Sequence, residues 1–274
     1  MPRILATACL AIALAATGGC SMFDRDDRST DPSANARQLF ETAERALETG
    51  NYRSAISNFE TLTAVYPFSE YAKQAQLDLM YAYWQNDEPE SAVSIADQFV
   101  LENPTHPRVD YAMYMKGLAW FPDDRGPLEK LFRVDPTKRP PGNLSRSFNA
   151  FAQMVQRYPD SPYADDARQR MVFLRNQLAA YEIHVADYYI RRDAYVAAAN
   201  RARYVVEAYQ ETPSVVDALQ IMVRAYDALG LDDLAAGTLR VLRENYPDQA
   251  YPWKRRTALV QRKPGPVSVP ETGK

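Results

Sequence analysis

Cysteine, histidine and glycine are scarce in this chain, whose 274 residues include two Cys, two His and 10 Gly. Both cysteines, Cys9 and Cys20, lie at the N-terminal end. The rest of the chain therefore has no thiol for a disulfide bond and no Cys/His set for the usual type of zinc site. Low glycine together with abundant alanine, leucine, arginine and glutamate favours helices over sheets.

Motifs for catalysis are also lacking. The chain has no glycine-rich phosphate loop and no HExxH sequence. His106 and His184 lie far apart in the chain, and nothing near either one indicates a Ser-His-Asp triad. Acidic pairs such as Asp123-Asp124 are explained as loop charges, although a hydrolase built on paired carboxylates stays open as the least favoured reading. The formal net charge of -3 argues against nucleic-acid binding. We expect no enzyme activity, no cofactor and no metal.

The N-terminal segment is apolar and differs from the rest of the chain. Residues 4–17 read ILATACLAIALAAT and follow Arg3. A helix of this length spans about 21 Å, which is short for the hydrocarbon core of a bilayer. A secretory signal peptide over residues 1–19 is therefore favoured over a transmembrane helix.

The residues after this segment resemble a bacterial lipobox. Small residues, Gly18 and Gly19, directly precede Cys20. This predicts cleavage between Gly19 and Cys20 and lipidation of Cys20. The residue after Cys20 is Ser21 and not Asp, which indicates sorting to the outer membrane. The polar residues that come next predict a lipidated flexible tether over 20–33.

A short motif recurs along the chain. It reads YPFSEYA at 66–72 and YPDSPYA at 158–164, with a weaker copy, YPDQAY, at 246–251. Tyr-Pro suits the end of a helix because proline cannot continue one. The three copies predict the junctions of a repeated helical unit.

The residues before the first copy match the second half of a tetratricopeptide (TPR) repeat. Gly50 permits a tight turn, and Ala55 allows two helices to approach closely. Phe59 and Leu62 share the face of Ala55 at i+4 and i+7. Pro67 ends the helix.

The same frame fits four more times, which predicts an all-α, right-handed TPR superhelix of about five helix-turn-helix repeats over 34–250. We assign N-terminal repeats to 34–121 and C-terminal repeats to 145–250. The third repeat is too long, and the excess contains five prolines, so we predict a loop insertion at 122–144. A disordered tail is predicted at 251–274.

One helix is predicted to be unusually long. Residues 163–191 contain no Pro or Gly, and apolar residues recur there every three or four positions. We predict Ser161 as its N-cap and Pro162 as its first residue, with Thr212 and Pro213 repeating the arrangement one repeat later.

Aromatic residues are concentrated in the first helices of repeats two and three. First helices line the concave face of a TPR superhelix. Most of these side chains are expected in the core, and some are candidates for a groove that anchors an extended client peptide. The set comprises Tyr81, Tyr83, Trp84, Tyr111 and Tyr114.

The run over 158–209 contains LRNQLAAYEIHVADYYIRRDAYVAAANR and resembles the centre of the BamD family, the TPR lipoproteins of the outer-membrane β-barrel assembly machinery. The likeness covers about 30–250. It implies a subunit that is anchored by lipid on the periplasmic face of the outer membrane. In such a subunit the C-terminal repeats bind the POTRA region of BamA, with further contacts to BamC and BamE. The N-terminal repeats hold the targeting segments of unfolded outer-membrane proteins.

The resemblance also implies a specific contact residue. In the family an Arg in the second helix of repeat four pairs with an acidic POTRA residue, and Asn200-Arg201 matches that position. The family's Asp-Arg-Asp run in the repeat-three loop is replaced here by DPTKRPPG at 135–142, so contacts of that loop are not transferred.

We therefore predict an outer-membrane protein assembly factor that promotes folding and insertion of barrel proteins. The alternative is a periplasmic TPR protein that coordinates cell-wall synthesis or division.

Overall fold

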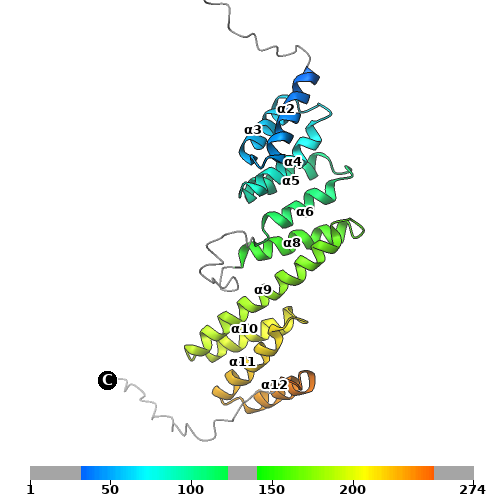
Figure 1. The fold of residues 1–274 in the computed structure, drawn as a ribbon. Coiled ribbons are helices and arrows are strands. Elements are labelled where there is room, and N and C mark those ends of the chain that lie inside the picture. Colours follow the sequence, from blue (N-terminus) through cyan, green and yellow to red (C-terminus); the bar gives the residue numbers. More distant parts are fainter. Residues whose placement is uncertain (1–31, 123–140, 250–274) are drawn as a thin grey trace, which may run out of the picture. The chain divides into compact units, whose positions relative to one another are not determined.

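The computed structural model describes residues 32–122 and 141–249, and these parts are helical throughout, with no strand (Figure 1). The predicted signal peptide, Cys20, most of the tether, positions 123–140 of the loop insertion and the tail lie outside the described residues. The all-helical fold is confirmed. None of the described helices is both long enough and apolar enough to cross a membrane.

The chain divides into two compact units, which we describe separately. Unit 1 ends at Ala119, and each of its helices packs against the next one in the chain. In addition α4 contacts α6, so the first helices of consecutive repeats are neighbours, as in TPR packing. The helices of unit 1 are α2 (Pro32–Glu48), α3 (Tyr52–Val65), α4 (Ala72–Gln85), α5 (Pro89–Glu102) and α6 (Val109–Ala119).

Unit 2 begins at Trp120 and repeats the same arrangement. Consecutive helices pack together, and α9 contacts α11. The long helix predicted from the sequence is α9, which has 28 residues and extends one repeat into the next. The helices of unit 2 are α8 (Gly142–Arg157), α9 (Ala164–Arg191), α10 (Tyr195–Ala208), α11 (Ser214–Ala228) and α12 (Asp232–Asn245).

Four of the turns between helices share one backbone conformation and one hydrogen bond. The residue at the turn has a positive φ, which is 74° at Gly50, 59° at Asp87, 57° at Asp193 and 72° at Gly230. In each turn the next backbone N–H donates to the carbonyl five residues earlier, as Asn51 does to Ala46 at 2.8 Å. This is the bond that closes a helix C-terminus with a left-handed residue. Of these four turns, only the one at Gly50 was predicted, and the two at aspartate are less expected because aspartate adopts this conformation less often than glycine.

A buried alanine follows each of these turns at the same distance. Ala55, Ala92, Ala198 and Ala235 each lie five residues after the left-handed residue, and none is more than 4 % exposed. A methyl group at this position lets the two helices of a repeat pack closely. The TPR frame predicted from the sequence is therefore confirmed in these four repeats.

The Tyr-Pro junctions are built differently from the prediction. At the second copy, Ser161 N–H donates to Tyr158 at 3.2 Å, and Ala164 N–H donates to the carbonyl of Ser161 at 2.9 Å. The same two consecutive turns occur at Tyr66, Ser69 and Ala72. The motif therefore forms a double turn, and the helix starts only at its final alanine.

Two predicted helix caps are consequently wrong. Helix α9 starts at Ala164 and has no side-chain cap, because the Ser161 hydroxyl accepts from the N–H of Tyr163 within the turn. Helix α11 starts at Ser214, and Thr212 donates its hydroxyl to the carbonyl of Tyr209 at 2.8 Å. In both cases local turn bonds compete successfully with capping.

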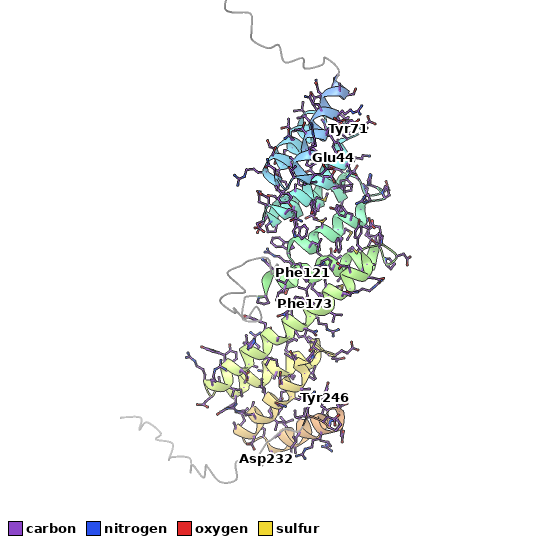
Figure 2. All side chains as sticks on the ribbon, in the orientation of Figure 1. Glu44, Tyr71, Phe121, Phe173, Asp232 and Tyr246 are labelled. Atoms are coloured by element: carbon purple, nitrogen blue, oxygen red, sulfur yellow. The ribbon has the colours of Figure 1, made fainter. Side chains whose placement is uncertain are left out.

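Two predicted boundaries also move by a few residues. Pro32 and Ser33, assigned to the tether, belong to α2, and residues 142–144, assigned to the loop insertion, belong to α8. The start of the insertion is held by Phe121, whose ring lies 6.3 Å from that of Phe151 and 5.6 Å from that of Phe173 (Figure 2). The sequence did not identify Phe121 as a packing residue.

Candidate functional site

The aromatic residues predicted to form a client groove divide into two groups. Tyr83 and Tyr114 are each only 9 % exposed and belong to the core of unit 1. The Tyr83 hydroxyl donates to the carboxylate of Glu60 on the neighbouring helix, and burial with this bond raises the pKa of Tyr83. These two side chains therefore support the fold and present no ring to a peptide, which corrects their assignment as anchors.

The other three aromatic residues are partly exposed on one surface of unit 1. The rings of Tyr81 and Trp84 lie 5.7 Å apart, and Gln85 donates to the Tyr81 hydroxyl at 2.8 Å. The guanidinium of Arg108 lies 4.9 Å from the ring centre of Tyr111, a cation-π contact. The surface therefore offers flat aromatic area together with hydrogen-bonding groups.

Polar residues extend this surface along α4. Gln74, Asp78, Tyr81 and Gln85 recur every three or four residues and so share one face of the helix. Gln74 donates to both carboxylate oxygens of Asp78, at 2.9 and 3.0 Å. We call this set, with Trp84, Arg108 and Tyr111, the unit 1 aromatic surface.

Asp78 is the electrostatically unusual member of the unit 1 aromatic surface. The pKa of its carboxyl group is raised to about 6. Burial is the largest cause, and the charge of nearby Glu44 (labelled in Figure 2) acts in the same direction, whereas Gln74 and Arg108 oppose the shift. A carboxylate held in this way is costly to the folded state at neutral pH. Such a cost is typical of residues kept for binding, although structural ion networks also produce it.

Changing Asp78 to Asn is expected to stabilise the protein at pH 7 by about 2 kcal/mol. The folded state binds this proton more tightly than the unfolded state, so wild-type stability should fall as the pH rises from about 4 to 6. The variant keeps an acceptor for Gln74 but should lack this fall. Denaturant unfolding of both proteins at pH 4.5 and pH 7 measures this difference in stability. If the stability of the two proteins changed equally with pH, the prediction would be contradicted.

The second predicted site lies on α10 in unit 2. Arg201 Nη1 donates to Glu182 Oε2 at 3.0 Å, with 47 % of the Arg201 side chain and 11 % of the Glu182 side chain exposed. Asn200 is exposed beside it and accepts a bond from Arg203 at 3.1 Å. Arg201 therefore already has a carboxylate partner within the chain, which the sequence did not predict.

The burial of Glu182 could have been recognised from the sequence. It continues the series Leu174 and Leu178 at four-residue spacing, and Ala186 and Ile190 follow it on the same buried face of α9. A carboxylate in such a stripe needs a cationic or hydrogen-bonding partner. Burial raises the pKa of Tyr209, a side-chain hydrogen bond between Tyr209 and Tyr204 raises it as well, and the charge of Glu182 adds to that rise.

Arg201 retains capacity for a second partner. A guanidinium carries five N–H donors in a planar fork, and only one of them is used by Glu182. Its half-exposed side chain can receive another carboxylate from outside the chain. In the described parts of both units, no cluster of three or more His, Cys, Asp or Glu side chains is suited to hold a metal.

The model of the YfiO family, described as an outer membrane lipoprotein, matches residues 32–242. The chain belongs to this family. "Outer membrane protein assembly factor BamD" of Neisseria meningitidis serogroup A is 40% identical over 92% of this chain and 94% of its own length. The protein of the same name from Vibrio cholerae is 38% identical over 85% of this chain and 95% of its own. The resemblance to the BamD family is thus confirmed.

Solved structures give only a distant likeness to this YfiO family member. The crystal structure of MamA protein has a TM-score of 0.36 and 17% identity, and covers 82% of this chain and 97% of its own. A kinesin light chain with TPR-like repeats has a TM-score of 0.38 and 16% identity, and covers 81% of this chain and 100% of its own.

Proposed function

We propose that the chain is a lipid-anchored scaffold on the periplasmic face of the outer membrane, which joins unfolded β-barrel proteins to BamA. The observation that carries this proposal is the similarity to BamD proteins over more than nine-tenths of the chain. Membership of the family makes the chain a non-enzymatic outer-membrane protein assembly factor associated with the outer membrane.

Unit 2, the C-terminal unit, would provide the contact with BamA. Arg201 and Asn200 lie side by side on α10, and the guanidinium of Arg201 has unused donors at a half-exposed position. An acidic side chain of the POTRA region would complement them. BamC and BamE would bind elsewhere on the same scaffold.

Unit 1, the N-terminal unit, would bind the unfolded β-barrel protein. The partly exposed rings of Tyr81, Trp84 and Tyr111 offer stacking surfaces to an extended chain. Extended peptides bind such surfaces through side-chain pockets and backbone hydrogen bonds. This combination tolerates varied client sequences because few contacts depend on one side chain.

A pull-down of the mature chain from detergent-solubilised envelope tests the proposal directly. We expect BamA and the other Bam lipoproteins to co-purify, together with unfolded barrel proteins. Recovery of peptidoglycan or division proteins without BamA would instead support a role in cell-wall synthesis.

A further inference from the structure

An apolar patch is exposed at the first repeat junction, in the turn between α3 and α4. Phe68 is 100 % exposed and Val65 is 59 % exposed. A fully exposed phenylalanine contributes nothing to folding through burial, because no surface is removed from water. Together with Tyr66, Pro67 and Tyr71 it lines a pocket of about 480 Å³. We call these five residues the junction patch.

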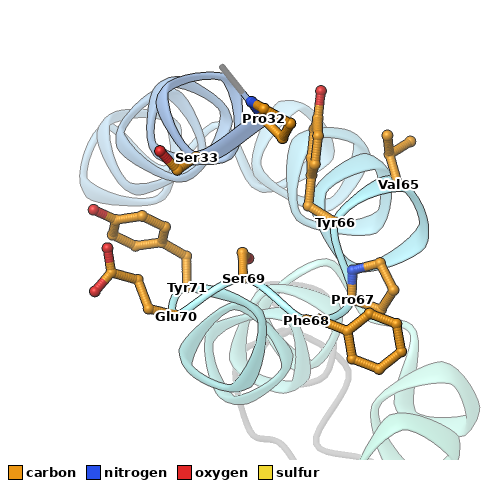
Figure 3. A pocket seen from close by; sticks show the side chains of 9 residues that line it. All are labelled: Pro32, Ser33, Val65, Tyr66, Pro67, Phe68, Ser69, Glu70 and Tyr71. Carbon is orange, nitrogen blue, oxygen red and sulfur yellow. The ribbon is translucent and has the colours of Figure 1, made fainter.

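The pocket lies where the chain enters the fold. Its remaining walls include Pro32 and Ser33, the first residues of α2 (Figure 3). In the close-up, Pro32 lies across the pocket from Pro67 and Phe68, with Tyr66 between them. The junction patch is therefore adjacent to the point at which the N-terminal segment leaves the helices.

The length of that segment limits where the patch can be. Residues 21–31 separate Pro32 from Cys20, and a fully extended chain of this length spans at most about 40 Å. If Cys20 carries lipid, the patch is held within this distance of the bilayer surface. A tether of so few residues gives a high effective concentration of one binding surface at the other.

We propose that the junction patch docks on the lipid surface beside the anchor. Phenylalanine and tyrosine side chains suit the boundary between headgroups and acyl chains, where the ring is buried and the hydroxyl stays wet. Four charged side chains lie near the patch. Glu70 and Lys73 are its neighbours in the chain, Arg37 and Glu41 act on Tyr71, and the four charges sum to zero. The contact is therefore apolar, and it does not depend on anionic lipid or on salt. It rests on the lipid anchor of the proposed function.

A fluorescent label at position 68 tests the docking. After signal cleavage Cys20 is the only cysteine and is blocked by lipid, so Phe68→Cys provides a single free thiol in the full mature chain. The labelled, lipidated protein is reconstituted into vesicles of phosphatidylethanolamine with or without phosphatidylglycerol. We expect the emission to shift to shorter wavelength and to be quenched by a bilayer-embedded quencher, equally in both vesicles and at high salt.

Thr49→Cys is the matched control. Thr49 is exposed and lies at the far end of α2, which is about 25 Å long, so its label should keep the emission seen in water. Protein that floats with the vesicles while the label at position 68 stays water-like would overturn the docking but leave the anchor intact. Protein that does not float would overturn both. A shift that needs an added unfolded barrel protein and occurs without vesicles would identify a client surface and reject lipid docking.

Discussion

Replacing Arg201 with glutamate is expected to weaken binding to the POTRA region of BamA by a few kcal/mol and to destabilise the C-terminal unit. The second effect arises because the new carboxylate would face Glu182, whose side chain is only 11 % exposed. Two carboxylates at this separation repel each other, and Glu182 loses its partner. Because Arg201 is half exposed, we expect a loss of about 2 kcal/mol in the free energy of unfolding.

The two effects of this substitution are separated by the charge-swapped double variant, Glu182→Arg with Arg201→Glu. It restores an ion pair of opposite sign and should recover stability, yet it presents an acidic group to the partner. Binding should therefore remain weak. Arg243→Glu is the control in the same unit, because it makes the same change of charge at an exposed arginine on a different helix, α12.

Thermal unfolding by circular dichroism and titration with the POTRA region measure both quantities. If the double variant folds normally and binds as tightly as wild type, the charge of Arg201 has no role in recognising BamA. If Arg201→Glu alone leaves co-purification of BamA unchanged, the assignment of this contact is wrong.

Replacing Cys20 with alanine is expected to release the protein from the membrane. The small residues directly before Cys20 predict that lipid on this cysteine attaches the protein to the membrane. The measurement is flotation of membranes after a urea wash, which removes protein that is held only by partners. Incorporation of labelled palmitate should disappear in the same variant.

Cys9→Ala is the control, since Cys9 lies in the same N-terminal segment and would leave with the signal peptide. This variant should be processed and anchored as wild type. Retention of the Cys20→Ala protein in washed membranes would show that the anchor lies elsewhere.

Several features of the fold were predictable because they depend on local sequence. The turn at Gly50 needs a left-handed residue, and the alanines after the turns need a small side chain. The length of α9 follows from an uninterrupted apolar stripe without Pro or Gly. Asp87 and Asp193 adopt the same conformation as the glycines, but their sequence signal is weaker because aspartate also occurs in many other turns.

The predicted helix caps were wrong for a different reason. Ser161 and Thr212 are of residue types that are common at N-caps. The sequence does not distinguish a side chain that caps a helix from one that forms a bond within the preceding turn. In the structure their side chains complete the junction turns, and the following helices start three and two residues later. These local turn bonds are an alternative to capping for the same side chains.

The sequence by itself determined the helical repeats, their junctions and the family, because these depend on spacing and on local backbone preference. Only the tertiary structure decided which aromatic rings are available. Tyr83 and Tyr114 are buried by neighbouring helices, whereas Tyr81, Trp84 and Tyr111 remain partly exposed. It also paired Glu182 with Arg201, 19 residues away on the next helix. Burial and ion pairing between helices depend on how whole helices pack, and this information is not contained in any short stretch of the chain.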